Sequence, residues 1–140
     1  MFLIPVFQDK FGEEEGNCMA ACVASIFEMR LRDVPNFVKH DDWFKRFCDF
    51  SRDAAGHEVV YHVVDGVDPE SGEPFVDLPD WTNLPNRLKN LHPYHIVSGP
   101  SERGLLHATV GWRGEILHDP HPSGAGLIRA VDYCFFRKIS

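Results

Sequence analysis

The stretch GNCMAACVASIFEM, residues 16–29, decides the fold, because it is apolar on nearly every side. Gly16 is a good turn residue and Asn17 a good helix N-cap, so we expect a helix that begins at Cys18 and ends near Met29. A helix that is apolar on most sides is a buried helix. The sequence therefore predicts a fold built around this segment, with a cysteine in the first turn of a buried helix.

The rest of the chain indicates one more long helix and then several strands. Residues 41–54 are typical of an amphipathic helix whose aromatic side chains face inward. These side chains are Trp43, Phe44, Phe47 and Phe50. A short helix is expected at residues 86–90, and strands at 57–64, 93–99, 104–112, 115–119 and 133–139. Because helices come first and strands later, we expect an α+β fold with a mostly antiparallel sheet.

The composition bounds the class of protein. The chain has 140 residues, the usual size of one domain, with 44% apolar and 25% charged residues. The formal net charge of −7 and the absence of a basic run argue against nucleic acid as a partner. No segment approaches the roughly 18 apolar residues of a membrane span. The first residues, MFLIPVF, have no basic flank and are too short for a signal peptide, so we expect a structural strand or extended arm there.

Cysteine usage points to a reduced, cytoplasmic protein. The chain has four cysteines, and their scattered positions do not fit a disulfide scaffold. Cys18 has a special place, because a thiol in the first turn of a helix is close to free N–H groups and to the positive end of the helix dipole. Both favour the reactive thiolate. The alternative is that Cys18 is a small buried apolar residue, a common fate of a free cysteine.

A histidine and an acid flank a turn in GLLHATVGWRGEILHDPHPSG, residues 104–124. A three-residue loop that ends at a left-handed Gly114 would place His107 directly opposite Asp119. Opposed side chains have Cβ atoms about 4.5–5.5 Å apart, close enough for the carboxylate to fix the tautomer of the imidazole. A two-residue loop would instead pair His107 with Pro120, and His107 would then be an ordinary core or surface histidine.

Three motifs together resemble the papain-like cysteine peptidases: GNCMAAC at a helix start, HATVGW on a strand, and ILHDPHPSG after it. The chain is most similar to the double-glycine peptidases that process bacteriocin leaders and to their stand-alone relatives. The resemblance extends from Gln8 to Pro120. It implies one papain-like domain over residues 1–140, a peptide or amide-containing substrate, and no metal or organic cofactor.

The resemblance also implies a role for each residue that matches a motif. Cys18 would be the nucleophile, His107 the general base and acid, and Asp119 the group that orients the imidazole. Gln8 would donate to the oxyanion together with the backbone N–H of Cys18. Gln8 lies ten residues before Cys18, a wider gap than the family shows, so Asn17 is a second candidate donor.

The activity that follows is acyl transfer through a thioester on Cys18, most simply the hydrolysis of an amide or isopeptide bond. Two alternatives stay open at this point. The same site would serve an acyltransferase that passes the acyl group to an amine, and a papain-like scaffold can also be a catalytically silent binding domain. We expect the acidic run Glu13–Glu15, which would raise the pKa of a neighbouring thiol, to point into solvent.

A zinc site is a further alternative for the same residues. Its ligands would come from Cys18, Cys22, His107, His118 and His121. The two cysteines stand four positions apart on one helix, which is not the spacing of a usual zinc site, so we expect no metal and interpret Cys22 as packing.

Substrate contacts are expected from the long loop at residues 65–85, because aromatic-rich loops over a rigid scaffold often bind ligands. Phe75 and Trp81 would form a substrate wall, or would cap the core instead. His121 would touch substrate from the turn after Asp119. The oligomeric state is left open.

Overall fold

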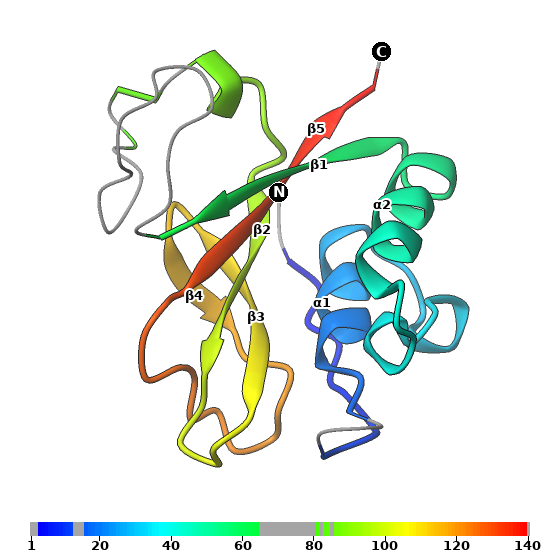
Figure 1. The fold of residues 1–140 in the computed structure, drawn as a ribbon, viewed down its shortest axis with the longest axis vertical. Helices are drawn as coiled ribbons and strands as arrows, with labels where there is room; N and C mark the ends of the chain where they lie inside the picture. The colour runs from blue at the N-terminus through cyan, green and yellow to red at the C-terminus, as the bar shows by residue number, and fades with distance from the viewer. Residues whose placement is uncertain (1–2, 13–15, 65–80, 82, 85, 140) are drawn as a thin grey trace.

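The computed structural model describes residues 3–12, 16–64, 81, 83–84 and 86–139. These residues form the expected α+β fold, with two α-helices and a five-stranded antiparallel sheet (Figure 1). The helices are α1 (Cys18–Ile26) and α2 (Trp43–Asp53), with short 3-10 turns at Leu31–Asp33, Phe37–Lys39 and Asn86–Leu88. The strands are β1 (His57–Val63), β2 (Tyr94–Pro100), β3 (Leu106–Trp112), β4 (Glu115–His118) and β5 (Asp132–Lys138). The strand order is β1-β5-β2-β3-β4.

Both helices cover the same face of the sheet. Figure 1 shows α1 and α2 together on one side, where α1 contacts β2 and β3 and α2 contacts β1. The main core lies between the helices and this face. A smaller cluster covers the opposite face, built from Leu88, Val97, Tyr133 and Phe135, with Trp81 packed against it. The sheet therefore has a core on each side, and the start of α1 lies over β3.

Helix α1 is buried as predicted, since every residue from Met19 to Ile26 is buried. It ends at Ile26 and not near Met29. Glu28 takes a left-handed conformation (φ 56°), and the N–H of Met29 donates to the carbonyl of Ala24 at 2.9 Å. This is the Schellman way of ending a helix, which normally uses glycine at the left-handed position. A glutamate at that position gave no sequence signal for the stop.

Helix α2 begins two residues later than predicted and turns one aromatic side chain outward. Phe47 is fully buried, and Trp43 and Phe50 are partly buried against the core. Phe44 is 37% exposed and packs against Tyr61 of β1, with the two ring centroids 5.4 Å apart. The prediction that Phe44 faces inward is therefore wrong. The buried face of this helix therefore includes three of the four aromatic residues predicted to lie there.

The β3–β4 hairpin differs from the predicted register. Arg113 and Gly114 both have left-handed backbone (φ 51° and 81°), which gives a two-residue turn of type I′. A β-bulge then leaves Leu117 as an extra residue in β4. The three-residue loop predicted here is wrong, and β4 ends before any pairing of His107 with Asp119. The two side chains meet by another route, described below.

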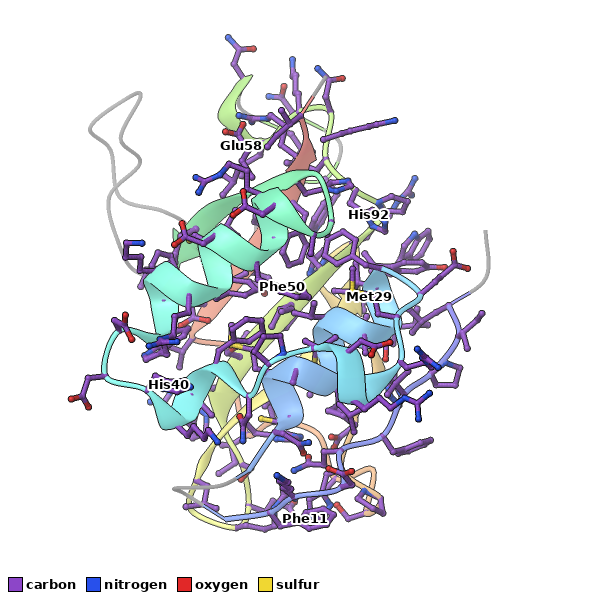
Figure 2. All side chains as sticks on the ribbon, turned by 90° about the vertical axis from the view of Figure 1, so that its right-hand side faces the viewer. Phe11, Met29, His40, Phe50, Glu58 and His92 are labelled. Carbon is purple, nitrogen blue, oxygen red and sulfur yellow. The ribbon has the colours of Figure 1, made fainter. Side chains whose placement is uncertain are left out.

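The N-terminal segment is an extended arm that links α1 to the end of β4. The N–H of Val6 donates to Oγ of Ser25 at 2.9 Å, and Nε2 of His118 bonds the carbonyl of Val6 at 2.8 Å. Figure 2 shows Phe11 of this arm at the end of the molecule where α1 begins. Within the described residues, no helix combines the length and apolar character needed to cross a membrane.

Candidate active site

The first turn of α1 is left without a side-chain cap. Asn17 precedes the helix, but its side chain makes no capping hydrogen bond. Its Oδ1 accepts from the N–H groups of Asp9 and Lys10 at 3.2 and 3.0 Å, and its Nδ2 donates to the Asp9 carboxylate at 2.8 Å. Asn17 therefore anchors the arm, and the expected capping role is wrong. The first N–H groups of the helix stay available beside Cys18.

Cys18 is partly buried, and its sulfur lies beside the backbone of β3. Burial raises the pKa of the Cys18 thiol above its usual range. The N–H groups of Ala108, Met19 and Cys18 itself stabilise the thiolate and act against this rise, whereas the Asp119 carboxylate adds to it. The net shift is upward, so the expectation of a lowered pKa in the free protein is wrong. Ala108 follows His107 directly, and its N–H brings the sulfur next to that histidine.

His107 and Asp119 form a buried pair. Nε2 of His107 and Oδ1 of Asp119 are 2.6 Å apart, and the two side chains are only 4% and 5% exposed. The carboxylate is held on its other side by the loop that follows β4. Its oxygens accept from the N–H of His121 at 2.9 Å and from the N–H of Gly126 at 2.8 Å. Asp119 thus contacts His107 from a loop, not from the paired position in a strand.

The two members of this pair have pKa shifts with different causes. Burial lowers the pKa of His107, and the hydrogen bond with Asp119 offsets only part of that effect. Burial acts to raise the pKa of Asp119, but hydrogen bonds from His107, His121 and Gly126 outweigh it, so the pKa is lowered. At neutral pH the pair is therefore a neutral imidazole and a carboxylate. The carboxylate accepts from Nε2–H, which leaves Nδ1 of His107 as the proton acceptor.

Cys18 and His107 line the same cavity, whose volume is about 590 Å³. Gln8 and His121 line it as well, so four of the residues expected in the site surround one space. The start of α1 and the β2–β3 connection lie at the same end of the molecule (Figure 1), and residues of both line the cavity. It is large enough for a group the size of an amino acid side chain and its peptide bond.

Hydrogen bonds from both the backbone and the side chain hold Gln8 in place. Its backbone N–H donates to the carbonyl of Pro120 at 3.0 Å, and Nε2 donates to the carbonyl of Lys10 at 2.8 Å. The side chain is 7% exposed, and Oε1 has no hydrogen-bond partner. The amide has a second hydrogen on Nε2, which is the one that an oxyanion would use.

The other histidines and cysteines near the site divide into two groups. His121 lies at the cavity, with its ring 6.2 Å from the ring of His107 and 5.3 Å from that of Phe11. His118 instead holds the arm through Val6, and Cys22 is fully buried in the core. Among the residues that the structure describes, no three His, Cys, Asp or Glu side chains are grouped as a metal site.

Trp81, one of the two residues of the predicted substrate wall, does not line this cavity. Trp81 packs in the cluster on the opposite face of the sheet, stacked on His95 at 5.4 Å between ring centroids. Phe75 lies outside the described residues. Sequence reasoning also missed the N–H groups of His121 and Gly126 that hold Asp119. The glycine-rich run DPHPSGAG, residues 119–126, was the available signal, since such loops expose backbone donors.

Comparison with known proteins gives no match: no family model, no curated protein and no solved structure matches the chain.

Proposed function

We propose that the protein is a papain-like cysteine hydrolase that cleaves an amide bond through a thioester on Cys18. The observation that carries this proposal is the buried His107–Asp119 pair at 2.6 Å, which borders the same cavity as a thiol at a helix start. A nucleophile, a base and a group that orients the base are the three parts of a catalytic triad. The order Cys18, His107, Asp119 along the chain follows the papain-like motifs.

The raised pKa of Cys18 and the lowered pKa of His107 define how the thiol is activated. In the free protein the two groups are neutral. As sulfur attacks the substrate carbonyl, the thiol proton moves to Nδ1 of His107 and a carbon–sulfur bond forms. The imidazolium then gives this proton to the leaving nitrogen as the carbon–nitrogen bond breaks. Asp119 stabilises the imidazolium that exists between these steps.

Water completes the cycle. His107 takes a proton from water as the oxygen attacks the thioester, the carbon–sulfur bond breaks, and the proton returns to the Cys18 sulfur. The oxyanion in both halves would be held by the N–H of Cys18, which has no intrahelical acceptor because it lies in the first turn of α1, and by Nε2 of Gln8. All four cysteines are free, which agrees with a thiol enzyme of a reducing compartment such as the cytoplasm.

An acyltransferase is the second candidate function, because an amine in place of water gives the same first half-reaction. The cavity favours neither acceptor, so the proposal rests on the acyl-enzyme itself. Its direct test is the reaction with p-nitrophenyl acetate. We expect a burst of p-nitrophenol and one acetyl group on Cys18 by mass spectrometry of the acid-quenched protein.

Two cysteine variants make this test specific. Cys18→Ala should lose both the burst and the adduct. Cys48→Ala is the matched control, because Cys48 is another partly buried free thiol, on α2 and outside the cavity lining. It should react like the parent protein. An acetyl group on Cys48, or a burst that survives Cys18→Ala, would contradict the proposal.

A further inference from the structure

The cavity extends well beyond Cys18 and His107, across the helix-covered face of the sheet. Ala108 pairs with Ser98, and Ser98 pairs with Asp132, so these three side chains form one row on β3, β2 and β5. Paired residues of antiparallel strands point to the same face. Asp132 therefore lies two strands away from Ala108, about 10 Å at the usual strand spacing. All three residues line the cavity.

The far end of the cavity has an acid set in apolar surroundings. The apolar residues of the lining include Val131 and Cys134, which are close to Asp132 in the chain, and Val38 and Trp43. Asp132 is partly buried among them, and its Oδ2 accepts from the hydroxyl of Tyr61 at 2.8 Å. Burial raises the pKa of Asp132, and hydrogen bonds from Tyr61 and Ser98 oppose only part of this rise.

The charges along the cavity are arranged by sign. Among the described residues that line it, Asp132 is the only carboxylate and Arg103 the only lysine or arginine. Arg103 lies on the β2–β3 connection, close enough to His107 to help lower its pKa. Of the charges on the described lining residues, the positive one is therefore near His107 and the negative one is at Asp132. A cation beside a partly buried carboxylate stabilises its charged form and can make a charge-assisted hydrogen bond with it.

We propose that Asp132 selects substrates whose acyl part carries a basic group on an apolar stem, such as a lysine or arginine side chain next to the scissile carbonyl. The stem would lie along the apolar walls, and the ammonium or guanidinium would reach the carboxylate. This inference rests on the proposed function, because it takes Cys18 as the point where the substrate carbonyl is held. It adds a specificity residue on β5, outside the three motifs of the candidate triad.

The test uses three chloromethyl ketones that alkylate a catalytic cysteine and differ only in side chain. They are the N-acetyl-lysyl, N-acetyl-norleucyl and N-acetyl-(ε-acetyl)lysyl derivatives. We expect the lysyl probe to alkylate Cys18 roughly 10- to 100-fold faster than the norleucyl probe, the range for a hydrogen bond to a charged group. The ε-acetyl-lysyl probe keeps the length without the charge and should show no such preference. Mass spectrometry identifies the alkylated residue.

Two variants assign the preference to Asp132. Asp132→Asn keeps the acceptor for Tyr61 and should remove the preference for the lysyl probe. Glu115→Gln is the matched control, because it removes the same charge from an exposed position on β4, outside the cavity lining, and should leave the preference intact. Circular dichroism confirms that each variant is folded. If Asp132→Asn fails to fold, Asp132→Ala takes its place, with the same loss of preference expected and an unchanged preference again contradicting the assignment.

The outcomes separate this inference from the proposed function. Equal rates for the three probes at Cys18, or a preference unchanged in folded Asp132→Asn, would overturn the inference and leave the thiol chemistry standing. Failure of all three probes to alkylate Cys18 would contradict the proposed function, and the inference would fail with it.

Discussion

Two of the buried histidines in the sheet, His95 on β2 and His107 on β3, lie on neighbouring strands and have different surroundings. His95 is 1% exposed, its Nε2 accepts from the N–H of Gly114 at 3.1 Å, and Trp81 stacks on its ring. His107 is 5% exposed, bonds Asp119 through Nε2, and borders a cavity that also holds Cys18.

Burial lowers the pKa of both histidines, to about 3 for His95. The shift alone therefore does not mark a functional histidine. What distinguishes His107 is a carboxylate that holds the ring, an empty space beside it, and a thiol in that space. His95 has a ring stack and a backbone donor, which are the features of a packing residue. We expect mutations at the two positions to separate activity from stability.

The largest expected effect is on the rate of acylation. Cys18→Ala and His107→Ala should each lower the rate of p-nitrophenyl acetate turnover by about 10³-fold or more while the fold is kept, because each removes a reacting group. His95→Gln retains an acceptor for the Gly114 N–H and should change the rate only a few-fold. Steady-state kinetics on the purified variants measures all three. Comparable losses at His95 and His107 would remove the distinction between them.

Asp119→Asn should lower the rate by at least about 10²-fold and should also move the pH profile. The rate needs neutral His107, so it rises with pH through the pKa of that group. The Asp119 carboxylate raises the pKa of His107 against the effect of burial. Its removal lowers that pKa further, and the acidic limb of kcat/KM should move to lower pH. A limb that stays in place or moves upward would mean that Asp119 does not act on His107.

His95 should dominate the acid sensitivity of the fold. Its pKa is about 3 in the folded protein, against about 6.5 in an unfolded chain, so the unfolded state takes up the proton first as the pH falls. Stability should therefore decrease as the pH falls below about 6.5, by as much as about 5 kcal/mol near pH 3. His95→Gln should flatten this dependence. Urea unfolding at several pH values measures it, and an unchanged slope would contradict the assignment.

The smallest effect is expected at His118. Its ring holds the carbonyl of Val6 and lies 4.9 Å from the ring of Phe7, so it secures the arm and not the imidazole. His118→Ala should cost about 1 kcal/mol of stability, the worth of one hydrogen bond, and should leave the rate within a few-fold of the parent protein. A loss as large as that of Asp119→Asn would mean that the arm takes a direct part in catalysis.

Sequence alone was sufficient to predict that the helix beginning at Cys18 is buried. This helix is apolar on nearly every side, and a helix of that kind is stable in water only when it is buried in a core. The pairing of His107 with Asp119 was also predicted, but by the wrong route. A left-handed Arg113 and the bulge at Leu117 have no clear sequence signature, since both depend on the strand partners.

The electrostatics of the site could not be predicted in the same way. The helix start at Cys18 suggested a thiolate, because the free N–H groups are visible in the sequence. How deeply the thiol is buried is set by tertiary packing, and burial outweighs those groups. The role of Asn17 also depends on tertiary structure. It has the chemistry of an N-cap, yet its side chain bonds Asp9 and Lys10, eight and seven residues upstream. Only folding brings those residues back to the start of the helix.

The central claim is that His107 takes the proton of Cys18, and the pH dependence of Cys18 alkylation by iodoacetamide tests it most directly. In the parent protein the rate should rise with a midpoint below about pH 6.5, because losing the proton of His107 lets the imidazole share the thiol proton. In His107→Ala the midpoint should move above about pH 8.5, the ordinary pKa of a free thiol, because burial raises the pKa of Cys18. A midpoint above pH 8.5 in both proteins would show that Cys18 and His107 do not act together, and the enzyme proposed here would be a silent scaffold.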